Sequence, residues 1–181
     1  MSPPPLVAFQ PKSLQSTFVF DKPVGNYFTP SSDIQIISLG VYDVQGDGLS
    51  SSHAVGIFDF MGASVTPTPN TPLVSVTIPA GNPPAGSKFV QNDFNNEGTW
   101  FITLATPLTL NAGTEYAIVG DNFGAELISF GLPTNYNIGQ DLTFNGSVFY
   151  LDPSTSITDT NVGVSGNTRV FLGPNFEYNL L

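Results

Sequence analysis

The chain contains no cysteine, only four cationic side chains and a single histidine among its 181 residues. Without cysteine, disulfide cross-links, thiolate catalysis and cysteine-ligated zinc sites are excluded. Nucleic-acid binding takes most of its affinity from Lys and Arg contacts with phosphates, and the four cations here are scattered: Lys12, Lys22, Lys88 and Arg169. With a formal net charge of −10, the protein is expected to bind neither nucleic acid nor an anionic membrane.

Long apolar runs and helix-forming segments are also missing. No segment approaches the roughly 20 apolar residues that a membrane-spanning helix needs, and residues 1–6 lack the basic and apolar regions of a signal peptide. The 18 Gly and 16 Pro disfavour helices, because they cost about 1 and 3 kcal/mol in a helix interior. Fifteen Phe and six Tyr argue against disorder. The composition predicts an all-β domain with long polar turns.

Residues 1–13 are expected to form an extended, proline-rich arm, and residues 14–181 a single β-sandwich domain. Residues 3–5 and Pro11 are prolines, which favour polyproline geometry. This geometry has no internal hydrogen bonds, so the arm needs a surface to pack against. That surface is either a neighbouring subunit or the arm's own domain, and the sequence leaves both open.

Alternating apolar residues predict about ten short strands at the spacing of a sandwich. The expected strands cover residues 14–20, 33–42, 54–60, 73–78, 100–104, 108–110, 115–119, 127–130, 142–144, 148–151, 167–172 and 175–178. The turns at 46–48, 111–113 and Asn145-Gly146 are interpreted as hairpin turns, the last as a type I′ turn. Residues 23–26 and 30–32 are interpreted as turns. The expected fold is one antiparallel β-sandwich with a jelly-roll-like strand order.

The acidic loop around residues 46–48 has two interpretations. Asp43, Asp47 and Asp59 offer the carboxylate oxygens that Ca²⁺ prefers, although the EF-hand spacing, with Glu at its twelfth position, is absent. Asp-Gly is also an ordinary turn pair, in which Asp accepts hydrogen bonds from its own backbone. The turn interpretation is preferred, and no metal site is assigned.

The sequence does not favour either of two catalytic arrangements, a serine–histidine triad or a pair of carboxylates. His53 follows the three serines at 50–52, but no Gly-x-Ser-x-Gly elbow accompanies it, so a hydrogen-bonded loop is preferred to a triad. Glycoside hydrolysis needs paired carboxylates, and the chain has only four glutamates: Glu97, Glu115, Glu126 and Glu177. The protein is not expected to be an enzyme or to carry a cofactor.

Aromatic residues could stack on sugar rings, as they do in sandwich lectins. Trp100 alternates with Ile102 and Leu104, which predicts that it lies in the core. The other candidates are Tyr27, Phe28, Phe94 and Tyr136, of which Phe94 and Tyr136 are expected in loops as partner contacts. The polar stretch 79–96, which contains Lys88-Phe89-Val90, is a further candidate binding loop.

The run LGVYDVQGDGLSSSHAVGIFD, residues 39–59, resembles a β-sandwich module of bacterial and cyanobacterial surface proteins, DUF4082-like and associated with the PEP-CTERM sorting tail. LATPLTLNAGTEYAI (104–118) and FLGPNFEY (171–178) extend the likeness. The resemblance implies a sandwich fold and a non-enzymatic role. The chain departs from the family in showing neither a signal peptide nor a basic, apolar C-terminal tail.

Two functions are therefore expected as alternatives. The first is a structural protein on a virion surface, a phage capsid decoration or cement protein that bridges neighbouring subunits. Its partners would be the major capsid protein or copies of itself, as a homo-oligomer. The second is an extracellular or cell-surface module that binds carbohydrate or matrix, with calcium as a candidate ligand. The two chain ends and the 79–96 loop are the expected contact regions.

Overall fold

The computed structural model describes residues 4–13, 15–60, 71–93, 95–150, 157, 162–165 and 169–181. Within them the chain forms sixteen strands and two 3₁₀ turns, η1 (Phe123–Ala125) and η2 (Pro133–Asn135). No helix in this described part is long and apolar enough to cross a membrane. The strands are β1 (Leu6–Val7), β2 (Phe9–Pro11), β3 (Ser16–Val19), β4 (Val24–Pro30), β5 (Ile34–Asp43), β6 (His53–Asp59), β7 (Val74–Ile78), β8 (Lys88–Gln91), β9 (Gly98–Leu110), β10 (Tyr116–Gly120), β11 (Leu127–Gly131), β12 (Tyr136–Ile138), β13 (Leu142–Tyr150), β14 (Val162–Ser165), β15 (Val170–Leu172) and β16 (Pro174–Leu180).

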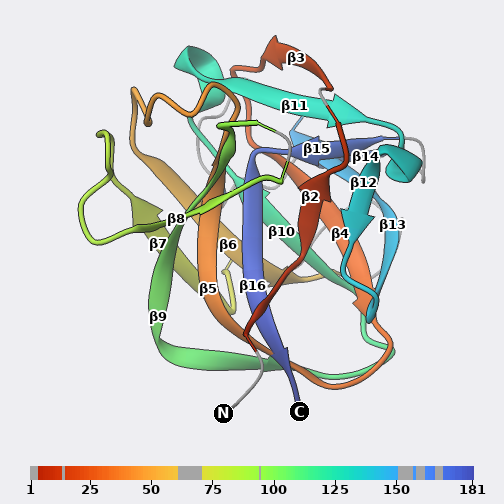
Figure 1. Cartoon of the computed structure of the whole chain (residues 1–181). Coiled ribbons are helices and arrows are strands. Elements are labelled where there is room, and N and C mark those ends of the chain that lie inside the picture. The colour runs from red at the N-terminus through yellow and green to blue at the C-terminus, as the bar shows by residue number, and fades with distance from the viewer. Residues whose placement is uncertain are drawn as a thin grey trace.

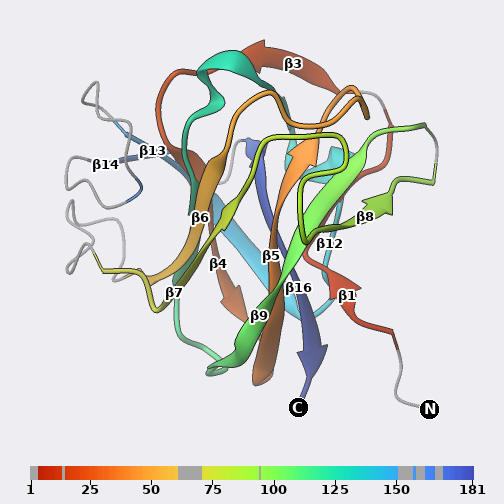
Figure 2. The same cartoon turned by 90° about the vertical axis from the view of Figure 1, so that its left-hand side faces the viewer.

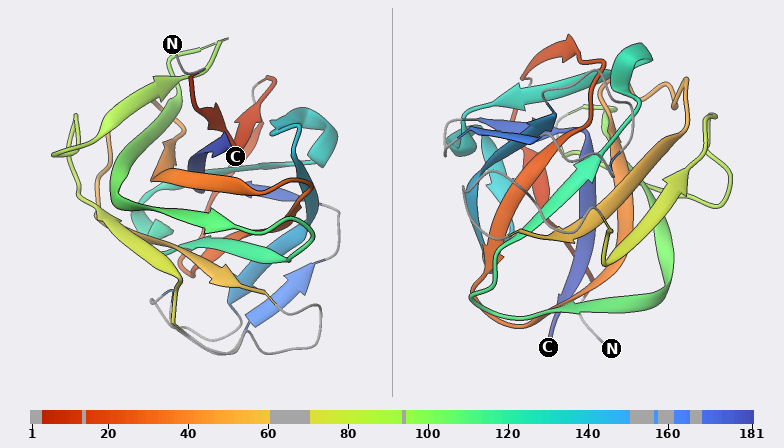
Figure 3. Two further views of the ribbon diagram at one scale, coloured as in Figure 1. Left: turned by 90° about the horizontal axis from the view of Figure 1, so that it is seen from below. Right: turned by 180° about the vertical axis from the view of Figure 1, so that it is seen from behind.

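Two large antiparallel sheets make the body of the protein (Figure 1). One has the strand order β1-β16-β5-β9-β8 and the other β14-β13-β4-β10-β6-β7. They lie in two layers, which Figures 2 and 3 show from the side, from below and from behind. The expected antiparallel β-sandwich is confirmed, and its jelly-roll strand order stays a prediction.

The core lies between the two layers and is rich in aromatic rings. Phe28 of β4 meets Phe176 of β16 across the interface, with ring centroids 5.0 Å apart. Both side chains are fully buried, as are Ile34 and Ile36 of β5. Burying one such side chain contributes about 1.5–3 kcal/mol, so the period-2 alternation of these strands fixes which face points inward.

Two small sheets complete the molecule. The sheet β15-β11-β3 lies at the end opposite to the two chain termini (Figure 1). The sheet β12-β2 uses the N-terminal arm, because β2 pairs with β12 and β1 pairs with β16. The Phe9 side chain is fully buried. Residues 6–11 therefore lie on their own domain as strands.

Two of the predicted hairpins are not formed, so these predictions are wrong. The loop at 46–48 joins β5 to β6, and the turn at 111–113 joins β9 to β10, yet in each case the two strands belong to different sheets. Each connection is a crossover between the layers. An alternating pattern marks a strand and its buried face, but it does not say whether the next strand pairs with it or faces it.

The third expected hairpin, at Asn145-Gly146, is also wrong. β13 runs through both residues and pairs with β4 on either side of them, with Phe144 opposite Phe28 and Gly146 opposite Tyr27. Asn145 is the extra residue of a β-bulge, and Gly146 has a φ of 156°. A dipeptide suited to a tight turn also suits a bulge, and the seven-residue partner β4 favours the continuous strand.

The predicted turns at 23–26 and 30–32 overlap the interior strand β4, which runs continuously from Val24 to Pro30 and pairs with β13 and β10. Gly25 has a specific role there. A Cβ atom at this position would lie 1.8 Å from the carbonyl oxygen of Ile118 on β10. The glycine that favours a turn by local propensity is here required by the close approach of the neighbouring strand.

Candidate functional site

The Asp43 carboxylate fixes the loop between β5 and β6. Its Oδ1 accepts hydrogen bonds from the backbone N–H groups of Gln45 (3.2 Å) and Gly46 (2.8 Å). Its Oδ2 accepts from the N–H of Gly48 (2.8 Å) and from Nε1 of Trp100 (3.1 Å). Asp43 is buried, so these four donors use both of its oxygens in place of water.

The other two aspartates of the calcium hypothesis are placed differently. Asp47 is exposed in the loop. Asp59 is exposed at the last position of β6, at the far end of that strand from the loop, because the loop leads into its first position. No group of three or more His, Asp or Glu side chains suited to a metal ion occurs among the described residues. The turn interpretation rests on the Asp47-Gly48 pair, whereas in the structure Asp43 accepts the backbone hydrogen bonds of the loop.

His53 opens β6 and is completely buried. Its Nδ1 lies 2.8 Å from the carbonyl oxygen of Asp121, which can only accept, so Nδ1 carries the proton. Its Nε2 has no hydrogen-bond partner in the described part of the chain and lies 3.9 Å from Oε1 of Glu126. Burial lowers the pKa of His53, against the opposing effect of the Asp121 carbonyl and the Glu126 charge.

The serines before His53 bond to Glu126. Ser50 Oγ donates to Glu126 Oε1 at 2.6 Å, and the backbone N–H of Ser51 donates to the same oxygen at 3.2 Å. Since the Ser50 hydroxyl is directed to a carboxylate, no described contact gives it the imidazole as general base. The expected hydrogen-bonded loop is present at these residues.

Each of the other three glutamates bonds to a different partner. Glu97 accepts from the Tyr42 hydroxyl (2.7 Å), and Glu115 accepts from the Asn145 amide (2.7 Å). Glu177 is buried, with an ion pair to Nζ of Lys88 at 2.7 Å and a hydrogen bond from Ser38. These carboxylates hold together strands that are distant in sequence.

Most of the aromatic residues proposed for stacking lie inside the protein. Trp100 is 8% exposed, which confirms its place in the core. Tyr27 and Phe28 are 7% and 0% exposed and are therefore buried rather than open to a sugar ring. Tyr136 is 2% exposed, so its prediction as a partner contact in a loop is wrong. Each of these three residues belongs to a strand, β4 or β12, that was not predicted because the residues around it favour turns. Phe94 lies outside the described residues.

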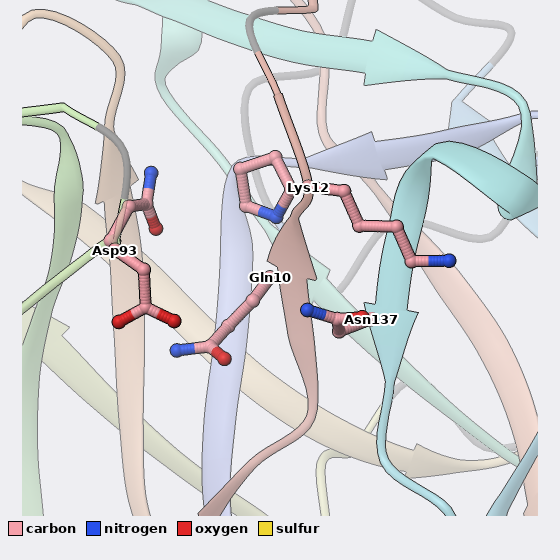
Figure 4. A pocket seen from close by; sticks show the side chains of 6 residues that line it. Gln10, Lys12, Asp93 and Asn137 are labelled. Atoms are coloured by element: carbon pink, nitrogen blue, oxygen red, sulfur yellow. The ribbon is translucent and has the colours of Figure 1, made fainter.

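A polar pocket of about 210 Å³ lies beside the N-terminal arm. Gln10 of β2 and Asn137 of β12 are cross-strand neighbours and both line it (Figure 4). Asp93, from the 79–96 stretch, lies on the opposite side, and Asn92 also lines the pocket. Lys12 points away from Asp93 and donates to the Thr134 carbonyl at 3.0 Å. Amides and one carboxylate can hydrogen-bond a small polar ligand.

A second, apolar cavity of about 630 Å³ lies where both chain ends meet; we call it the terminal groove. Leu6, Leu180 and Leu181 line it and are 36%, 47% and 67% exposed. Pairing of β1 with β16 holds its two sides together. Exposed leucines gathered in one groove are typical of an interaction surface. The chain ends were expected contact regions, but periodicity does not reveal that the leucines share one groove.

No protein-family model, curated protein or solved structure matches this chain.

Proposed function

We propose that the chain is a non-enzymatic structural protein that attaches to a larger protein assembly through the terminal groove. Its specific form is a decoration protein on a phage capsid, with the major capsid protein or further copies of this chain as partners. The terminal groove is the observation that supports the proposal. Three of the six large hydrophobic side chains exposed in the described residues line this one cavity.

The surrounding chemistry agrees with a contact of this kind. Burial of apolar side chains at the centre of a contact provides affinity, and the acidic remainder of the protein limits non-specific association. β1 is also the outermost strand of its sheet, so a partner segment can pair with its free edge. The carboxylates of Asp43, Glu126 and Glu177 stabilise loops and strands, which supports a structural role.

The proposal is tested by co-sedimentation of the purified protein with capsids from its source. The double variant Leu180→Ser, Leu181→Ser removes two exposed side chains from the groove without touching the core. Leu132→Ser is the matched control, because Leu132 is 52% exposed outside the groove. Wild type and control are expected to associate and the double variant to stay in solution. Equal association of all three, or no association of the wild type, contradicts the proposal.

A second candidate function is a surface module that binds carbohydrate. It is favoured by a different feature, a group of partly exposed phenylalanines at the opposite end of the molecule from the terminal groove. A glycan array probed with the wild-type protein tests it, and an array without any bound glycan contradicts it.

A further inference from the structure

The small sheet β15-β11-β3 and Phe20, the residue after β3, place four phenylalanines in contact with one another at the protein surface. Phe18 packs edge-on against Phe130, with ring centroids 4.7 Å apart and planes at 89°. Phe171 lies directly opposite Phe130 in the strand register, and Phe20 stacks on Phe171 at 6.5 Å. All four rings are only partly buried, so this sheet presents aromatic surface to solvent.

Three of these rings, those of Phe18, Phe130 and Phe171, form the floor of a shallow trough of about 450 Å³. Its lining consists of Ser16, Thr17, Phe18, Phe130, Arg169 and Phe171. The volume is within the range of about 300–1,000 Å³ that is typical of ligand sites, which combine apolar walls with a few polar groups. The Ser16 hydroxyl and the Arg169 guanidinium supply polar groups here.

Arg169 is the distinctive residue of the trough. Its guanidinium carbon lies over the Phe130 ring, 5.4 Å from the ring centre, in a cation–π arrangement that holds the planar group on that ring. The chain has fourteen acidic residues and four cationic ones, yet no described carboxylate forms an ion pair with Arg169. The side chain is exposed, so its planar fork of donors is available to a carboxylate.

From this combination we infer that the trough binds an acidic saccharide, a pyranose that carries a carboxylate. The C–H face of a sugar ring packs on the electron-rich face of a phenyl ring. The sugar hydroxyls reach Ser16, which lies opposite Phe130 in the strand register, while the ring carboxylate pairs with Arg169 through two parallel hydrogen bonds. The inference deepens the second candidate function and is independent of the terminal groove.

The probes are tetragalacturonic acid and its methyl ester, in which each carboxylate is replaced by an uncharged, slightly larger ester group. Calorimetric titration of the wild-type protein is expected to show tighter binding of the acid. Arg169→Gln is expected to weaken binding of the acid by about tenfold, the loss typical of a charged hydrogen-bonded pair, and to leave the ester unchanged. Phe130→Leu removes the ring and keeps an apolar side chain, so it is expected to weaken both ligands.

Lys12→Gln is the matched control. Lys12→Gln and Arg169→Gln each remove one positive charge and take the net charge from −10 to −11, but Lys12 lies outside the trough. It is expected to bind the acid as the wild type does. Equal loss in Lys12→Gln and Arg169→Gln, or equal affinity of the wild type for acid and ester, overturns the inference.

Two negative results are distinguishable. If the wild type binds neither probe but binds other glycans on the array, the inference fails and the second candidate function stands. If it binds no glycan at all, both fail.

Discussion

Truncation of the Asp43 side chain is expected to cost more stability than any other single change in the loop between β5 and β6. Asp43→Ala removes the acceptor of four donors, of which the Gly48 N–H and the Trp100 Nε1–H are in buried hydrogen bonds. Each buried donor left without a partner costs about 1–3 kcal/mol, so we expect a loss of about 2–6 kcal/mol. The loss is readily measured against a typical unfolding free energy of about 5–15 kcal/mol.

Urea denaturation at neutral pH measures this loss, with Asp47→Ala as the control. Asp47 is exposed in the same loop, and a surface substitution of this kind changes stability by less than about 0.5 kcal/mol. The Trp100 contact is isolated by Trp100→Phe alone and together with Asp43→Ala, since a shared hydrogen bond makes the two losses non-additive. Equal losses for Asp43→Ala and Asp47→Ala would refute the reasoning. So would a rise in melting temperature on addition of calcium that both aspartate variants abolish.

Three further outcomes are expected. Gly25→Ala places a Cβ against a carbonyl oxygen of β10 and is expected to lower the free energy of unfolding, measured in urea, by about 3 kcal/mol or more. Gly124→Ala is the control, because a Cβ there meets no atom closer than 3.8 Å. Similar losses for the two variants would contradict the close approach at Gly25. Burial places the folded-state pKa of His53 below its usual 6.5, so the stabilisation from neutral His53 is present above that pH and is lost as the pH falls through the folded-state value. An NMR titration that gives an imidazole pKa above 6.5 would contradict this. Lys88→Met leaves the buried carboxylate of Glu177 without its cation. Because the Lys88 side chain is about half exposed, we expect a moderate loss of unfolding free energy, about 1–3 kcal/mol, which adding Glu177→Gln partly recovers. An unchanged urea midpoint for Lys88→Met would contradict the ion pair.

The fold class is predictable from this sequence because it depends on composition and on period-2 alternation. The pairing of strands is not, because pairing is decided by contacts between distant segments. Asn145-Gly146 illustrates the difference: its local preference suits a turn, but pairing with β4 on both sides of it makes a bulge. Pro23, Gly25 and Asn26 likewise favour a turn locally, whereas two neighbouring strands hold residues 24–30 extended.

The same distinction applies to the candidate sites. The role of Asp43 was predictable, because its backbone donors lie within five residues of it. The terminal groove and the phenylalanine trough were not, because each joins residues from opposite ends of the chain. Phe18 and Phe130 contact through the pairing of β3 with β11, and no local pattern in the sequence encodes that register.

Hydrogen–deuterium exchange of the protein, free and bound to capsids from its source, tests the proposed function most directly. We predict that binding slows exchange of the backbone amides of Leu6 and residues 178–181, which line the terminal groove, and leaves exchange in β3 and β11 unchanged. Slower exchange at β3 and β11 with no change at the chain ends would contradict it.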